Sequence, residues 1–579
     1  MTSSFESPLN RFEQVKREAG EGGIDPELLP YIQASKEEDD QDYIIDSDSE
    51  DTAVVASLVK HSMLAGPLEE VVDEIVLTQH DDTVDEGDIA EICDELSTDD
   101  RAAFHSESLD EAAALHALDQ KVNTIYQSII ARKPEHRPNP SLDRVRRVME
   151  YMGDPHSAYP SIHITGTNGK TSVTRMIDAL CTEQGLRTGR FTSPHLHTVR
   201  ERIAIDNEPI SREGFIAAYE DIKPIITLVD NECAEQGQAP LSFFEVLTAM
   251  AFQAFADAPV DVAIVEVGLG GTWDCTNVLP SSVQVLTPID VDHQRWLGAT
   301  VEEIARDKAG IIKPDSLVIS GPQHHSVTQI ISQAATAHSS VARFYGTDFQ
   351  VCERNLGVGG QIVTLRTPAG IYEDVFLPLF GAHQATNAAV ALTAFEAFMS
   401  GGLQDPTVVE HAMMNVSSPG RVEVVRSSPT VIVDACHNPA GATTLVDTLE
   451  ESFAFGTVIG LFSAMKDKDV EGVLSVLEPV FEEIVLVEMP GERSMPLEQM
   501  RSIAHDVFGE DRVHESAESP SYEENTAHGI ALAADLGEAQ VSDGQKAGVV
   551  ACGSVVFAAD VRQACHHAHS IRRTRNSLL

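Results

Sequence analysis

Apolar residues from position 115 onward recur either at helical spacing or in short continuous runs. Leu115, Leu118, Val122, Ile125 and Ile129 follow the three-to-four-residue period of an amphipathic helix, and a second helix is predicted to begin at Ser141. Four short apolar runs predict buried strands at residues 162–164, 262–267, 283–287 and 317–320. Because strand and helix signals alternate, we expect a doubly wound, parallel α/β sheet.

The pattern breaks at residues 417–421, where the sequence reads Ser-Ser-Pro-Gly-Arg. The alternation then resumes, with strands predicted at 431–433, 458–462, 484–487 and 548–552. We therefore predict a four-part organisation. Its parts are an extension at residues 1–112, a first α/β domain at 113–416, a hinge at 417–421 and a smaller α/β domain at 422–579.

Charge is distributed unevenly along the chain, whose net charge is −51. Residues 1–120 hold 33 acidic and 6 basic side chains, a net of −27, and the remainder hold 91 − 33 = 58 acidic and 40 − 6 = 34 basic ones, a net of −24. Such a surface repels nucleic acids and anionic membranes, so neither is expected as a partner. The acidic extension is expected to be largely disordered, and it acts either as a solvating tail or as a partner-binding arm.

The cysteines and the first residues bear on the cellular compartment. The 8 cysteines are scattered and include no CxxC pair, which is typical of reduced thiols rather than of disulfides or a zinc site. The N-terminus has neither a basic segment nor an apolar core of a signal peptide, and no apolar run approaches the roughly 20 residues of a membrane span. We expect a cytoplasmic protein.

A glycine-rich turn follows the first predicted strand, in the segment Ser161-Ile-His-Ile-Thr-Gly-Thr-Asn-Gly-Lys-Thr-Ser172. Backbone N–H groups in such a turn can surround phosphate oxygens at the start of the helix that follows. Lys170 would reach the β- and γ-phosphates, and a hydroxyl of Thr171 or Ser172 could face Mg²⁺. Only Thr167 and Asn168 separate Gly166 from Gly169, so the turn is shorter than the standard phosphate loop. An ordinary strand-to-helix turn is the alternative.

Several polar residues occupy positions where open α/β sheets bind ligands. Glu266 lies at the end of a predicted strand and could bind Mg²⁺ or face solvent. His293 and Asp434 follow predicted strands as well. Lys308 is either a surface lysine of a helix or a side chain directed at the active site. Arg421, in the hinge, could bind phosphate through two hydrogen bonds or form an interdomain salt bridge.

Taken in order, these segments resemble the folylpolyglutamate synthase/dihydrofolate synthase family of the Mur ligase superfamily, over residues 115–579. The matching segments are Ile164–Ser172, Thr192–Leu196, Arg200–Ile203, Ser242–Glu245, Glu266–Gly271, Asp274–Asn277, Asp292–His293, Leu297–Gly298, Lys308–Ile311, Gly381–Gln384 with Asn387, Pro419–Arg421 and Asp434–Asn438. Two positions depart from the family pattern. Thr272-Trp273 stands where many members have an Arg after the double glycine, and Ala435-Cys436 replaces the commoner Gly-Ala.

The resemblance implies a P-loop ATPase-like domain followed by a Rossmann-like glutamate ligase domain, and it assigns a role to each matched position. ATP would be bound by Gly166, Thr167, Asn168, Gly169, Lys170, Thr171, Asn387, Arg421 and Asp434. Two Mg²⁺ ions would be held, one by Ser193 and Glu266 and the other by His293. Lys308 would be a carbamylated lysine that organises the metal site. The binding site for the pterin substrate would be lined by Ser242, Phe243, Phe244, Glu245, Trp273, Asp274 and Cys275. Lys170, Lys308, His293 and Glu266 would be the catalytic set.

The implied reaction is amide ligation: ATP phosphorylates a carboxylate of the pterin substrate, and the amine of L-glutamate displaces phosphate from the acyl phosphate. The acceptor would be a reduced folate, dihydropteroate or both, in a monomeric enzyme. Two alternatives stay open. A Mur-type ligase of UDP-linked precursors has a similar loop, although residues 1–110 lack the strand signals of its N-terminal domain. A non-catalytic nucleotide-binding scaffold would make the lysine and metal positions dispensable.

Overall fold

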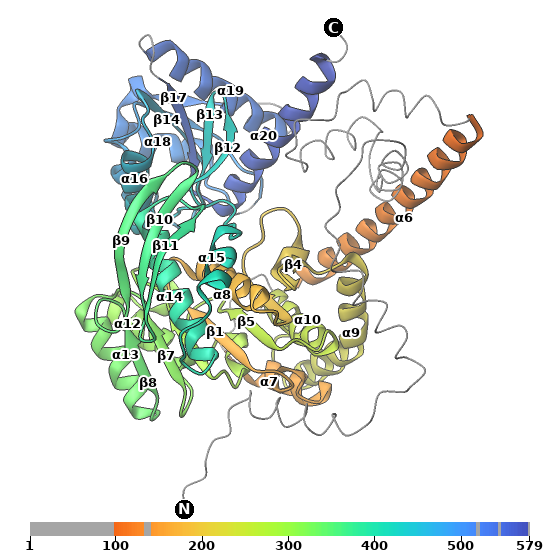
Figure 1. The fold of residues 1–579 in the computed structure, drawn as a ribbon. Helices are drawn as coiled ribbons and strands as arrows, with labels where there is room; N and C mark the ends of the chain where they lie inside the picture. The colour runs from red at the N-terminus through yellow and green to blue at the C-terminus, as the bar shows by residue number, and fades with distance from the viewer. Residues whose placement is uncertain (1–97, 133–140, 492, 517–521, 542–545, 577–579) are drawn as a thin grey trace, which may run out of the picture. The chain divides into compact units, whose positions relative to one another are not determined.

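The computed structural model describes residues 98–132, 141–491, 493–516, 522–541 and 546–576 (Figure 1). The predicted extension up to residue 97 lies outside these ranges. The chain separates into two units, residues 1–123 and 124–579. Helix α6 (Thr98–Ile130) confirms the helical period read between residues 115 and 129, and it runs across the predicted boundary at 112.

The second unit contains an eight-stranded sheet that includes all four predicted strands of the first α/β domain. These are β1 (Ser161–Thr165), β5 (Val262–Glu266), β6 (Val283–Leu286) and β7 (Leu317–Ser320). They pair in parallel, and the full order is β4-β3-β2-β5-β1-β6-β7-β8. The other four strands are β2 (Thr188–Phe191), β3 (Ile203–Ile205), β4 (Glu208–Pro209) and β8 (Val341–Phe344). Because β3 and β4 are antiparallel to their neighbours, the sheet is mixed at one edge.

Nine α-helices belong to the described part of the chain between residues 141 and 414, and several of them begin or end at residues that typically cap helices. They are α7 (Asp143–Met152), α8 (Lys170–Glu183), α9 (Arg212–Glu235), α10 (Phe243–Asp257), α11 (Gln294–Leu297), α12 (Val301–Lys308), α13 (His325–Ala337), α14 (Ala382–Phe398) and α15 (Pro406–Met414). Helix α7 confirms the second predicted helix and ends at Gly153, whose φ of 79° is a left-handed conformation. Ser242 and Thr300 cap α10 and α12 through capping boxes.

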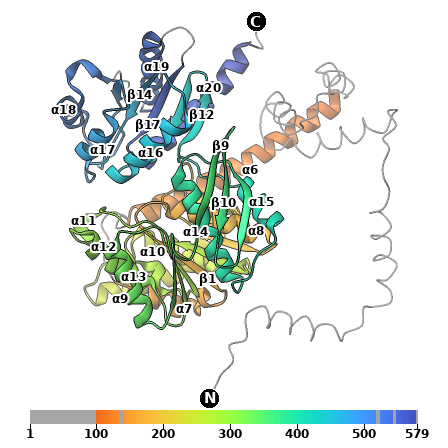
Figure 2. The ribbon, with the colours of Figure 1, turned by 60° about the vertical axis from the view of Figure 1, so that its left-hand side comes forward.

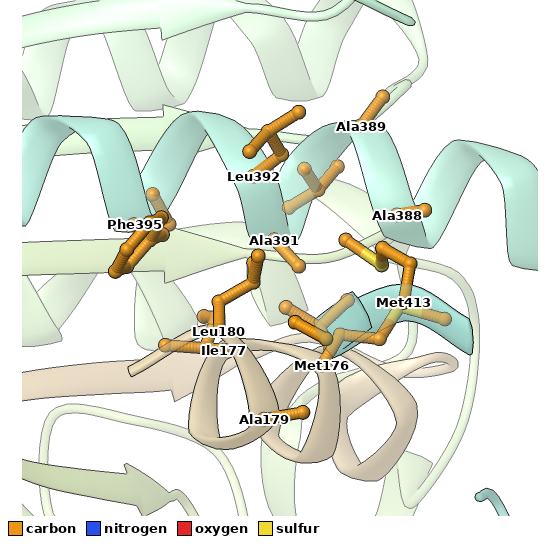
Figure 3. Close-up of a cluster of buried hydrophobic side chains, with 14 of the residues drawn as sticks. Met176, Ile177, Ala179, Leu180, Ala388, Ala389, Ala391, Leu392, Phe395 and Met413 are labelled. Carbon is orange, nitrogen blue, oxygen red and sulfur yellow. The ribbon is translucent and has the colours of Figure 1, made fainter. Parts of the chain in front are cut away.

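Helix α8 carries the glycine-rich turn at its start and is held by an apolar cluster shared with α14 and α15. Figure 3 shows side chains of α8 beside those of the other two helices, namely Met176, Ile177 and Leu180 with Ala388, Ala391, Leu392, Phe395 and Met413. All eight are nearly or fully buried. The position of the turn therefore depends on this packing.

We expect Leu180→Ala to lower the free energy of unfolding by about 2–5 kcal/mol, because it removes a fully buried side chain and leaves a cavity. The midpoint of urea unfolding measures the change. Leu228→Ala is the matched control, since Leu228 is 46% exposed on α9 and its truncation should cost little. Equal losses for the two variants would contradict the packing described here.

An antiparallel three-stranded sheet, which was not predicted, follows β8. It consists of β9 (Gln350–Gly357), β10 (Gly360–Arg366) and β11 (Ile371–Leu377), with β10 in the middle. Strands β9 and β10 contact α14, and Figure 2 shows them alongside that helix. Because only one face is covered, apolar residues alternate with exposed ones, and bulges interrupt both ladders. A search for continuous apolar runs misses such strands.

The last part of the chain forms a six-stranded sheet that includes all four strands predicted there. The strands are β12 (Glu423–Ser427), β13 (Thr430–Val433), β14 (Thr457–Phe462), β15 (Glu483–Leu486), β16 (Val513–Glu515) and β17 (Ala547–Cys552). The order is β12-β13-β17-β14-β15-β16, and only β12 is antiparallel. The helices are α16 (Pro439–Ser452), α17 (Val470–Leu477), α18 (Leu497–Phe508), α19 (Tyr522–Gln540) and α20 (Val555–Asn576). None of the helices described has a long enough apolar stretch to cross a bilayer.

Candidate active site

The turn between β1 and α8 requires glycine at two positions. Gly166 and Gly169 have φ values of 148° and 87°. A Cβ atom on Gly166 would lie 1.8 Å from Thr287 Oγ1, and one on Gly169 would lie 2.8 Å from Asn387 Oδ1. The turn therefore packs against Thr287, which follows β6, and against α14, with no room for side chains at the two glycines. The backbone N–H groups of Thr167 and Asn168 donate to the Pro288 carbonyl at 2.9 and 3.4 Å, so a ligand would be bound by the N–H groups in the first turn of α8.

Two lysines converge on this turn, the half-buried Lys170 and the buried Lys308. The Lys170 Nζ atom donates to the carbonyl oxygens of Gly166 (3.1 Å) and Thr167 (3.2 Å), and Lys308 Nζ donates to the same Gly166 oxygen at 2.7 Å. Burial lowers the pKa of Lys170, against the attraction of Glu266. Burial and the nearby charge of Lys170 lower the pKa of Lys308 to about 7. Much of the Lys308 amine is therefore uncharged near neutral pH.

Glu266 ends β5 next to the first turn of α8. Both carboxylate oxygens accept from the Thr171 hydroxyl, at 3.1 and 3.0 Å, and one accepts from the Ser193 backbone N–H at 3.4 Å. Burial raises the pKa of Glu266, while Lys170 opposes this rise. Three of the predicted site residues thus meet at one point beside the glycine-rich turn.

These donors fit a magnesium ion. Mg²⁺ prefers oxygen ligands and usually takes only one or two carboxylates from protein, completing its shell with water and phosphate. Glu266 supplies the carboxylate and Thr171 a hydroxyl. Within the described ranges there is no cluster of three or more His, Cys, Asp or Glu side chains, but a phosphate-bound Mg²⁺ does not need one.

His293, the residue predicted to hold a second metal ion, lies at the start of α11 in a left-handed conformation with a φ of 51°. Its side chain is 38% exposed. Although the side chain is partly exposed, desolvation of the ring by the surrounding protein and the charge of Lys468 lower the pKa of His293 to about 4, against the attraction of Asp292, so the ring is neutral near pH 7. A neutral imidazole can bind a metal ion, although oxygen is the donor that Mg²⁺ prefers.

Asp292, next to His293, is where the loops that follow strands of the six-stranded sheet contact the part of the chain that carries the eight-stranded sheet. Lys468 Nζ lies 2.9 and 3.2 Å from the two Asp292 oxygens, and Asn438 Nδ2 and His437 Nε2 lie 3.4 and 3.5 Å from one of them. Burial would raise the pKa of Asp292, but the hydrogen bond from His437 and the charge of Lys468 hold it well below its usual range. Asn438 Nδ2 also donates to Asn168 Oδ1 of the glycine-rich turn, at 3.3 Å.

Lys468 was missed in the sequence. It follows β14 in the segment Lys466-Asp-Lys468, and the carboxyl end of a parallel strand is where polar residues gather around a ligand. The same rule that singled out Asp434 could have found it.

Asn387 and Arg421 lie beside α8 and the hinge. Asn387 Nδ2 donates to Gln384 Oε1 at 3.0 Å, and the Ser172 and Ser418 hydroxyls share a hydrogen bond of 2.9 Å that joins α8 to the hinge. Arg421 Nη1 donates to the neighbouring Gly420 carbonyl at 2.9 Å. In the described part of the chain no carboxylate forms a salt bridge with Arg421, which favours anion binding over the interdomain salt bridge.

Asp434 follows β13 and is held by backbone amides. Its two oxygens accept from Val422 N at 2.9 Å and from Cys436 N at 2.8 Å. Burial raises the pKa of Asp434, and Arg421 opposes that effect. The carboxylate therefore has a defined orientation at the carboxyl edge of the second sheet.

At the start of α10, two of the predicted substrate residues have structural roles. Ser242 caps the helix, and Glu245 completes the capping box by accepting from Ser242 N at 2.7 Å. Glu245 also pairs with buried Arg144 at 2.8 Å. Phe243 lies under the Arg202 guanidinium. The Phe243 ring also packs against Tyr126 and is buried.

Phe244 is the other aromatic residue at this end of α10. It packs on Phe191, and a Cβ atom on Gly268 would lie 2.3 Å from the Phe244 ring. Phe244 therefore lies directly against the loop that follows β5 and Glu266.

The second predicted substrate segment follows the double glycine after β5. Asp274 accepts from Leu269 N at 2.9 Å and from Thr276 N at 3.0 Å. The Cys275 thiol contacts the Thr248 hydroxyl at 3.1 Å. Asp274 and Cys275 are buried, whereas Trp273 is half-buried against the cluster beneath α12 and α13. Trp273 is thus the most accessible of the three.

Known proteins resemble this chain over most of its length. A family model described as Mur ligase, glutamate ligase domain, matches residues 420–554. The chain is similar to a dihydrofolate synthase/folylpolyglutamate synthase of Mycobacterium tuberculosis, with 44% identity over 477 residues that cover 78% of this chain and 94% of the relative. A Bacillus subtilis protein of the same name is 33% identical over 344 residues, which cover 59% of this chain and 79% of the relative.

Solved structures agree with these matches. The chain is similar to a folylpolyglutamate synthase of Mycobacterium tuberculosis complexed with ADP and AMPPCP, with 42% identity and a TM-score of 0.72, covering 77% of this chain and 99% of that one. It is also similar to the folylpolyglutamate synthase of Thermotoga maritima, with 30% identity and a TM-score of 0.65, covering 77% of this chain and 97% of that one.

Proposed function

The chain belongs to the dihydrofolate synthase/folylpolyglutamate synthase family, and from this premise we propose the reaction that its active site performs. It is an ATP-dependent ligase that adds L-glutamate to reduced folates and to dihydropteroate through an acyl phosphate. One observation carries the proposal: Lys170, Lys308, Thr171 and Glu266 converge on a single glycine-rich turn.

The turn and Lys170 would bind and orient the phosphates of ATP. The N–H groups at the start of α8 point at one spot, and Lys170 needs only to leave two carbonyl oxygens to reach a γ-phosphate. In phosphoryl transfer, catalysis consists mainly of positioning and of charge stabilisation. Mg²⁺ held by Glu266, Thr171 and Ser193 would neutralise phosphate charge when bound, and a second ion at His293 is part of the proposal.

The nucleotide would lie between the two α/β domains. Asn387 belongs to the first domain, Arg421 to the hinge and Asp434 to the second domain. Contacts from Lys468 and Asn438 to Asp292 and Asn168 already join the domains around this position. Such an enclosure would keep water from the acyl phosphate until the amine of glutamate attacks.

Lys308 is proposed to carry a carbamate, because carbamates form from uncharged amines and the pKa of Lys308 is about 7. At fixed dissolved CO₂, the carbamylated fraction should therefore rise as the pH increases through 7 and fall below it, which ¹³C NMR with labelled CO₂ measures. Lys308→Ala should lower the ligation rate about a hundredfold, and a short carboxylate in solution should restore part of it. Full activity without rescue would remove the carbamate role.

Incorporation of labelled L-glutamate tests the proposed reaction. The protein is incubated with ATP and Mg²⁺ and, in separate arms, with dihydropteroate, tetrahydrofolate or a UDP-linked peptidoglycan precursor. We expect ligation in the first two arms, with one ADP and one phosphate per amide bond. Turnover with the UDP-linked precursor alone would favour the Mur-type alternative, and binding of ATP without turnover in any arm would favour a scaffold.

The cellular setting follows from the same proposal. ATP, glutamate and folates are small molecules of the cytoplasm, and the seven cysteines that the structure describes are all free thiols. We place the enzyme there, as a monomer.

A further inference from the structure

Two buried cysteines meet at the carboxyl ends of neighbouring strands in the second sheet. Strands β13 and β17 pair in parallel with Val433 opposite Ala551, and Gly553 N donates to the Cys436 carbonyl at 3.0 Å. This register places Cys436 beside Cys552, and both side chains belong to the same buried apolar cluster on one face of the sheet. Cys436 is 8% exposed and Cys552 is fully buried. The pair is thus held together by the backbone of two adjacent strands.

The pair lies directly beside Asp434. The Cys436 N–H is one of the two amides that hold the Asp434 carboxylate, at 2.8 Å. The Cys436 Cβ atom is also close to α16, because a Cβ atom on Gly441 would lie 3.1 Å from it. Cys436 therefore cannot move without disturbing Asp434 or the start of α16. Cys436 is also one of the two positions where this chain departs from the family pattern.

We propose that Cys436 and Cys552 form a thiol-oxidation site, in which a peroxide joins them into a disulfide that weakens ATP binding. One thiolate attacks the O–O bond of hydrogen peroxide, which gives a sulfenic acid and, after proton transfer, water. The second thiol then attacks the sulfenic sulfur and expels a second water. Two S–H bonds and one O–O bond are broken, one S–S bond is formed, and both electrons pass from the thiols to the peroxide.

The disulfide would act on the nucleotide site through geometry. A disulfide brings the two sulfur atoms to about 2.0 Å, well inside the separation of two thiols in contact. Because Cys552 lies within the paired strand β17 whereas Cys436 lies after the end of β13, we expect the loop at residues 434–438 to take up the backbone part of this shift. The amide of Cys436 would then move away from Asp434. The effect on ATP rests on the proposed role of Asp434, whereas formation of the disulfide does not.

The neighbouring Cys552 thiol and burial together raise the pKa of Cys436, so the reactive thiolate is scarce and the oxidation should be slow. A small uncharged oxidant suits such a site better than a bulky disulfide such as oxidised glutathione. The described cysteines include one exposed thiol, Cys352, which oxidant reaches more readily and which serves as the internal comparison.

The test is peroxide treatment of the full-length protein, followed by tryptic mass spectrometry and direct measurement of ATP binding. In the wild-type protein we expect one new disulfide-linked peptide pair that contains Cys436 and Cys552. The Kd for ATP should rise about tenfold, and dithiothreitol should reverse the change. Cys436→Ala and, separately, Cys552→Ala should bind ATP normally before treatment and be insensitive to it, while Cys352→Ser should respond like the wild type.

The proposal is overturned if the linked peptide pair is absent after oxidation, or if Cys436→Ala loses ATP affinity to the same extent as the wild type. A disulfide that forms without any change in ATP affinity would contradict the proposed effect of oxidation on ATP binding. These results are separate from the ligase proposal, because glutamate incorporation by the reduced protein is measured independently.

Discussion

Replacement of Lys170 by alanine is expected to lower kcat for glutamate-dependent phosphate release about a thousandfold. Its ammonium is buried beside the glycine-rich turn and is attracted by Glu266. A charge so placed, in a site sheltered from water, stabilises the transferring phosphoryl group far more than an exposed charge would. Steady-state kinetics with saturating ATP measure the loss.

Lys223→Ala is the matched control, since Lys223 is about half exposed and its ammonium contacts only Glu220 and the Tyr219 ring among the described residues, both on the same helix. That variant should retain wild-type activity. Circular dichroism and the urea midpoint establish that Lys170→Ala is folded. A folded Lys170→Ala protein with turnover close to that of the wild type would show that the lysine is not needed, which would contradict its proposed role in phosphoryl transfer.

Glu266→Ala should cause a loss of similar size, about a thousandfold in kcat/KM, because it removes the carboxylate proposed to hold Mg²⁺. It also removes the partner of the Thr171 hydroxyl, which donates to both carboxylate oxygens. The two effects separate in a Mg²⁺ titration. We expect the concentration of Mg²⁺ needed for half-maximal activity to rise strongly.

Glu515→Ala is a suitable comparison, since Glu515 is a partly exposed carboxylate that pairs with Arg501 at 2.9 Å, away from the glycine-rich turn. Its replacement should leave the Mg²⁺ requirement unchanged. If Glu266→Ala has the wild-type Mg²⁺ dependence, the carboxylate does not take part in metal binding and its role is confined to Thr171.

The parallel strands were predictable because they are buried on both faces and read as continuous apolar runs. β1, for example, is buried throughout. The sheet formed by β9, β10 and β11 was not predicted, because only one face is covered and buried positions are interrupted by more exposed ones along β10 and β11. The intrinsic strand propensity of the residues says little about a strand that forms because it pairs with neighbouring strands.

In the candidate site, residues at strand ends were found because topology alone brings them to one sheet edge. Glu266 and the turn at Gly166 are examples. Contacts between domains were harder to foresee. Lys468 reaches Asp292 only through the way that the second domain packs, a relation between residues 176 positions apart. Glu245 shows the reverse case, since a motif residue predicted to bind substrate is engaged by Arg144 and a helix cap.

Isotope transfer tests the central claim most directly. The carboxylate of a tetrahydrofolate substrate is labelled with ¹⁸O, and the released phosphate is analysed by mass spectrometry after complete ligation with ATP, Mg²⁺ and L-glutamate. An acyl phosphate places one carboxylate oxygen on phosphorus, so the account predicts phosphate that carries one ¹⁸O for each amide formed. Amide formation with phosphate free of ¹⁸O would contradict it.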